Sequence, residues 1–178
     1  MERIILIETS TALCSTALAE DGTITSYRES SAPKAHASLT AVFVQEMLSE
    51  RGLTLADCDA VCVSMGPGSY TGLRVGVSTA KGLCFGSGKP LLAVGTLDTL
   101  VAQAADEADA AGRAGQYRYI IPMIDARRME VYTAVFEPTG ASATANGSEG
   151  SLPYRQITET APVIIDENSF AKELEAGP

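Results

Sequence analysis

A glycine-rich stretch constrains the fold of this chain more than any other feature of its sequence. Residues 66–82 read GPGSYTGLRVGVSTAKG and contain five glycines. Their spacing, G-x-G-x-x-x-G, fits neither the dinucleotide fingerprint G-x-G-x-x-G nor the phosphate loop G-x-x-x-x-G-K followed by Ser or Thr. Pro67 between two glycines predicts a sharp turn, and Ser69 or Thr71 can then cap a helix that runs to about Phe85.

The helix expected after this turn carries glycines in its interior. Gly72, Gly76 and Gly82 each cost about 1 kcal/mol relative to Ala, so another interaction has to offset the loss. Gly72 and Gly76 lie one turn apart and form, with Thr79 and Leu83, a smooth stripe that another backbone can approach closely. One interpretation packs this stripe inside the chain's own fold. The other presents it to a partner, and the stripe alone does not decide between them.

A second helix is expected over residues 34–51, which are bounded by helix start and stop signals. Its apolar arc is wider than a helix lying on one face of a sheet requires. Two helices with surplus apolar or smooth faces favour a helical docking surface for a partner. The residues expected at this partner interface are Leu39, Phe43, Met47, Gly72, Gly76, Thr79 and Leu83.

Strand-like segments surround these helices in the order βββαβαβα. They cover residues 3–8, 14–20, 23–30, 60–65 and 91–94, with an Asp21-Gly22 turn between the second and third, and a last helix runs from residue 97 to about 105. The alternation of strands and helices predicts an α/β domain over residues 1–105.

Part of this pattern recurs after a polar, small-residue linker at residues 106–116. Shifted by 117 residues, Ile7-Glu8 falls on Ile124-Asp125, and Thr16-Ala17-Leu18 falls on Thr133-Ala134-Val135. The match predicts a second copy of one β-hairpin unit at the start of a second region, residues 117–178. The elements expected there are strands at 117–125, 130–137 and 162–165, a mobile loop at 138–152, and a short helix at 169–175.

Composition and charge exclude several classes of function. The formal charge of -9 opposes a surface that follows nucleic-acid phosphates. His36 is the only histidine, which rules out a metal site built from several histidines within this chain, and it is interpreted as a capping or packing residue. The four cysteines form no C-x-x-C pair and are expected to be buried thiols, without disulfide or zinc. We predict no catalytic and no metal-binding residue, no membrane span, and a cytoplasmic protein.

Two strand ends carry the remaining chemistry. Glu8-Thr9-Ser10 and Asp125 place a carboxylate at the end of a strand beside a turn, where it can hold a phosphate or a hydrated magnesium ion. Turns also use such residues simply to satisfy backbone groups. This second interpretation is favoured for Glu8, because no glycine nearby lets a phosphate approach.

Three motifs together resemble a known family. They are the E-T-S-T turn after the first strand, G-P-G-S-Y-T-G-L-R-V-G, and I-D-A-R-R-M-E-V-Y. Over most of residues 1–137, and more weakly through 161–170, the chain resembles the TsaB (YeaZ) family of bacterial tRNA threonylcarbamoyladenosine biosynthesis proteins. The resemblance implies an actin-like ATPase (ASKHA) fold with two RNase H-like lobes. Since such relatives continue beyond Pro178, the second lobe is expected to be incomplete.

The resemblance also implies a function. Such proteins are non-catalytic partners of TsaD, the related subunit that carries metal-binding histidines and transfers a threonylcarbamoyl group to an adenosine beside the tRNA anticodon. The helices at 34–51 and 69–85 would form the bundle shared with TsaD, or with a second copy in a homodimer. An ATPase subunit completes the complex, tRNA is contacted only indirectly, and ATP or ADP with Mg is expected only at the complex interface. The glycoprotease-like name of the superfamily has no peptidase site to support it here.

Two alternatives stay open beside the accessory-subunit hypothesis. One is an ATP-dependent small-molecule kinase or ATPase of the same fold, using Glu8 and Asp125 with magnesium. Glu8 replaces the Asp usual at the first phosphate loop of the superfamily, and no D-x-G-T is present, which argues against autonomous ATP hydrolysis. The other is a homodimer with no further role.

Overall fold

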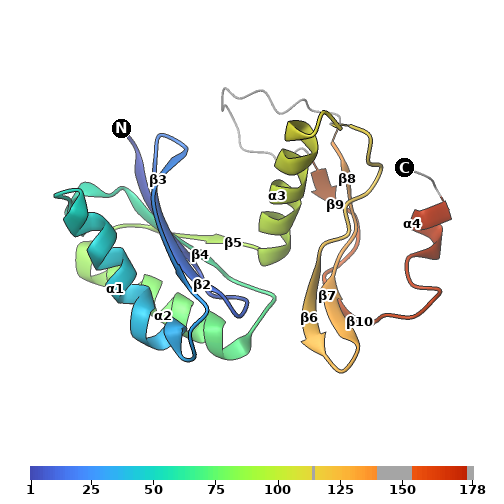
Figure 1. Cartoon of the computed structure of the whole chain (residues 1–178), viewed down its shortest axis with the longest axis horizontal. Coiled ribbons are helices and arrows are strands. Elements are labelled where there is room, and N and C mark those ends of the chain that lie inside the picture. Colours follow the sequence, from blue (N-terminus) through green and yellow to red (C-terminus); the bar gives the residue numbers. More distant parts are fainter. Residues whose placement is uncertain (114, 140–153, 176–178) are drawn as a thin grey trace. The chain divides into compact units, whose positions relative to one another are not determined.

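The first half of the chain folds around a five-stranded sheet (Figure 1). Its antiparallel part is the expected meander of β1 (Arg3–Glu8), β2 (Cys14–Glu20) and β3 (Thr23–Ser30), and β4 (Ala60–Ser64) and β5 (Leu91–Val94) continue it in parallel, in the order β3-β2-β1-β4-β5. The computed structural model describes residues 1–113, 115–139 and 154–175, and within it Met1–Thr96 form the first of two units. The predicted α/β class is confirmed.

Helices α1 (Ala35–Glu50) and α2 (Tyr70–Ser87) lie side by side against this sheet (Figure 1). Ser69 caps α2 as expected, since its Oγ accepts a hydrogen bond from the Gly72 N–H at 3.3 Å. A short 3-10 helix, η1 (Leu55–Asp57), precedes β4. The core between helices and sheet contains Ile5, Ile7, Leu18, Val44, Leu48, Cys58, Val61, Val63 and Ala80. Alternate positions of β1 and β4 supply it, which is the period of a strand with one face buried.

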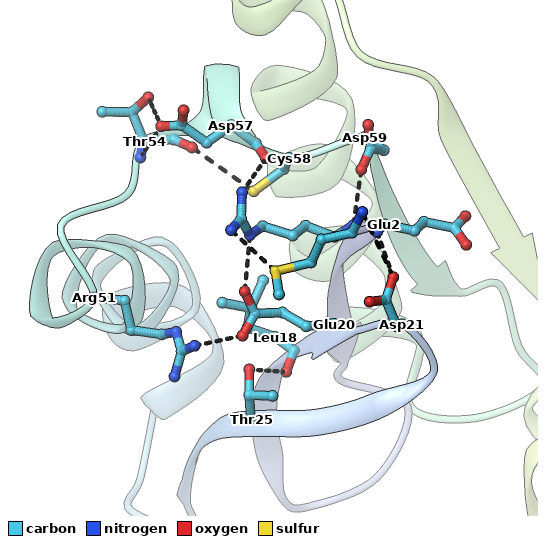
Figure 2. Close-up of polar contacts among 12 residues, drawn as sticks. Glu2, Leu18, Glu20, Asp21, Thr25, Arg51, Thr54, Asp57, Cys58 and Asp59 are labelled. Atoms are coloured by element: carbon cyan, nitrogen blue, oxygen red, sulfur yellow. Dashed lines mark hydrogen bonds and ion pairs between the residues drawn. The ribbon is translucent and has the colours of Figure 1, made fainter.

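A buried carboxylate fastens the end of α1 to the sheet. Glu20, at the end of β2, is 8% exposed. Its Oε1 accepts a hydrogen bond from Arg3 Nε at 2.8 Å, and its Oε2 pairs with Arg51, the residue that follows α1 (Figure 2). The hydrogen bond from Arg3, with the charge of Arg51, lowers the pKa of the Glu20 carboxyl.

The second unit begins at Leu97 and contains two small sheets in its described residues. After α3 (Thr96–Ala110), one sheet has the order β10-β7-β6, and the other pairs β8 with β9. The strands are β6 (Met123–Arg127), β7 (Glu130–Thr133), β8 (Phe136–Pro138), β9 (Tyr154–Gln156) and β10 (Ala161–Ile164), followed by α4 (Ala171–Glu175). None of the helices in the described ranges is long and apolar enough to span a membrane.

The prediction of a linker over residues 106–116 is wrong for residues 106–110, which belong to a helix. Helix α3 continues to Ala110, and the boundary between the two units falls after Thr96 instead of residue 105. Leu97, Val101, Ala105 and Ala108 are all buried, so one face of α3 packs along its length. Small residues at 106–111 suggested a linker, but Ala is also the best helix former.

The strand expected at residues 130–137 is two strands in different sheets. Between β7 and β8, the Val135 N–H donates to Thr158 Oγ1 at 2.9 Å and its carbonyl accepts from the Ile157 N–H at 2.8 Å. Residues 131–136 are mostly apolar, and they contain no glycine or proline that would indicate a change from one sheet to the other. The strand expected at 117–125 starts only at Met123, and β9 was not predicted. The loop expected at 138–152 lies outside the described residues except for positions 138 and 139.

Each position of the expected repeat holds an antiparallel hairpin, β1–β2 and β6–β7. In both hairpins the carboxylate at the end of the first strand accepts a hydrogen bond from the backbone N–H two residues on: Ser10 N–H to Glu8 at 2.6 Å, and Arg127 N–H to Asp125 at 2.7 Å. The registers differ by one residue, because Ile7 pairs with Thr16 whereas Ile124 pairs with Tyr132.

Candidate functional site

Gly72 and Gly76 are sealed inside the first unit. Both are buried, and the backbone that approaches them belongs to the chain itself, at Thr9 after β1. A Cβ at Gly72 would overlap the Thr9 carbonyl oxygen, and a Cβ at Gly76 would overlap the Thr9 side chain. The internal interpretation of these glycines is therefore correct, and the expectation that they face a partner is wrong.

The other residues expected at the interface do not form one exposed surface. Met47 is 1% exposed, and its sulfur lies 3.9 Å from the Thr16 hydroxyl, so it belongs to the core and not to a docking surface. Leu83 is half-buried and packs against the core cluster. Leu39, Phe43 and Thr79 are half-buried.

A different face of α2 is open. Thr71, Val75, Ser78, Gly82 and Phe85 follow one another at spacings of four, three, four and three residues, and we call these five residues the α2 seam. Val75 is half-buried and the other four are exposed, with Phe85 at 93%. Apolar and small residues at this spacing form one stripe on a helix, as in the contact line of a coiled coil. No charged side chain belongs to the seam.

The glycines in the second half of α2 have no packing reason within the described residues. A Cβ at Gly82 or Gly86 would meet nothing within 4 Å beyond the helix's own backbone, in contrast to Gly72 and Gly76. Each still costs about 1 kcal/mol of helix propensity. A bare helix surface beside an exposed Phe side chain is typical of a site that another molecule covers. The sequence contains two signals of this seam, the spacing of its five residues and the apolar Phe85 near the end of the helix.

The strand end at Glu8 does not fit a phosphate or a magnesium ion. One carboxylate oxygen accepts the Ser10 N–H and the other accepts the Ser64 hydroxyl. Thr9 and Ser10 are fully buried, and the Ser69 N–H donates to the Ser10 carbonyl at 2.6 Å, so the start of α2 closes over them. Both carboxylate oxygens of Glu8 are therefore engaged within the fold, whereas the hydroxyls of Thr9 and Ser10 are buried without a hydrogen-bond partner among the described residues. We therefore derive no step through a nucleotide at this position.

The fourth residue of the expected nucleotide set, Asp125, lies in the second unit. Its side chain is exposed, and its Oδ1 holds the turn after β6. His36 is half-buried and its Nε2 lies 3.0 Å from the Thr11 carbonyl oxygen, a packing contact of the kind expected for a single histidine. Burial raises the pKa of the Cys58, Cys62 and Cys84 thiols, which makes them weak nucleophiles.

Comparison with protein families gives a match over most of the chain. Residues 28–160 match the family model described as "TsaD: tRNA N6-adenosine threonylcarbamoyltransferase". The tRNA threonylcarbamoyladenosine biosynthesis protein TsaB of Escherichia coli K12 is 38% identical over 135 residues, which are 76% of this chain and 55% of that protein. The chain thus spans about half the length of the curated relatives it matches.

The transferases themselves match a shorter part. The tRNA N6-adenosine threonylcarbamoyltransferase of Maricaulis maris is 43% identical over only 67 residues, 38% of this chain and 18% of the transferase. Among solved structures, YeaZ from Pseudomonas aeruginosa superimposes with a TM-score of 0.74 and 27% identity, covering 94% of this chain and 70% of that one. Among these individual proteins, the long matches are therefore to TsaB and YeaZ, and those to the transferases are short.

Proposed function

The chain belongs to the tRNA N6-adenosine threonylcarbamoyltransferase (TsaD) family, and we propose that it serves there as a TsaB-type docking subunit and not as the transferase itself. The α2 seam is the observation that carries this proposal. It is an exposed, uncharged stripe with bare glycines and one exposed Phe side chain, on a helix whose opposite face is fixed in the core. Helical interfaces use stripes of this kind.

The proposed partner is a TsaD-type subunit, bound through α1 and α2 in a heterodimer. These 178 residues contain a single histidine, which cannot by itself supply the several metal-binding histidines that the family resemblance assigns to the transferase. In isolation, two copies would associate through the same seam. The ATPase subunit and tRNA would join through the complex, in the cytoplasm, and any ATP or ADP with Mg would bind at its interface, because the chain's own strand end at Glu8 is closed.

Substitution of Phe85 tests the proposal. Burying a Phe side chain contributes about 1.5–3 kcal/mol, and 1.4 kcal/mol corresponds to a factor of ten. Phe85→Asp should therefore weaken binding to the TsaD-type subunit at least tenfold in isothermal titration calorimetry. Because the side chain is 93% exposed in the single chain, the unfolding midpoint should not change when it is measured at a concentration too low for two copies to associate.

Ile24→Asp is the matched control. Ile24 is an apolar side chain of β3, at the edge of the sheet away from the strands that α2 contacts, and it is 50% exposed, so the same acidic group there should leave the affinity close to wild type. Equal effects of the two substitutions, or no effect of either, would contradict docking through the seam. Magnesium-dependent ATP turnover by the purified chain that Asp125→Ala abolishes would instead favour the kinase or ATPase alternative.

A further inference from the structure

We draw no further inference here: the strongest candidate, the apolar face of the five-stranded sheet opposite α1 and α2, where the side chains of Tyr27, Leu92 and Val94 are exposed, carries nothing because nothing in the structure shows what covers it.

Discussion

Two glycines of α2 have opposite roles, although the sequence presents them alike. Gly76 lies against the Thr9 side chain, whereas a Cβ at Gly82 would meet no described residue within 4 Å. Gly76→Ala should therefore destabilise the chain by about 1–3 kcal/mol, the usual cost of forcing extra atoms into a packed core. Gly82→Ala should stabilise it by up to about 1 kcal/mol through helix propensity. Urea denaturation of both variants measures the two free energies of unfolding.

The two substitutions control for each other, because both add one methyl group to the same helix. Equal effects would mean that Thr9 does not pack against Gly76, and Gly76 could then face a partner. At the residue scale, the sequence could predict that another interaction offsets the loss of helix propensity at glycines inside a helix. It could not predict which glycine packs on the chain itself, because Thr9 and Gly76 are brought together only by the fold.

At the scale of elements, Glu20 connects β2 to the end of α1 through Arg51 and to β1 through Arg3. The pKa of its carboxyl is lower in the folded chain than the ordinary value of 4.5. A depressed folded pKa contributes stability that is fully present above the unfolded value and is lost as the pH falls through the folded one. Glu20→Gln should therefore destabilise the chain at neutral pH, and its difference from wild type should shrink as the pH falls below 4.5.

Urea denaturation of wild type and Glu20→Gln from pH 7 to pH 3 checks this sign. A difference between the two proteins that stays constant or grows on acidification would show that the ion pairs do not lower the carboxyl pKa.

Elements were the most predictable level of the structure. Periodicity and caps gave β1 to β5, α1 and α2, whereas the change of sheet at Val135 depends on a hydrogen bond to Thr158, far away in the sequence.

At the scale of the whole molecule, the glycine-rich motif indicated the right family for an incorrect physical reason. The motif fixes α2 onto the loop after β1, and the seam that we propose as the docking surface lies on a different face of that helix. The sequence also placed Glu8 beside Thr9 and Ser10 as candidate ligands. The hydrogen bond from Ser64 to the Glu8 carboxylate could not be predicted, because Glu8 and Ser64 come close only when β1 pairs with β4 in the sheet.

The most direct measurement of the docking account is the reactivity of a thiol placed in the α2 seam. Ser78→Cys puts an exposed thiol in the seam, and Thr23→Cys puts one at the start of β3, at the edge of the sheet away from α2. The native cysteines are buried or half-buried and should react slowly. With saturating TsaD-type subunit, labelling at position 78 should slow at least tenfold while labelling at position 23 stays unchanged. Unchanged labelling at position 78 in the formed complex would contradict the account.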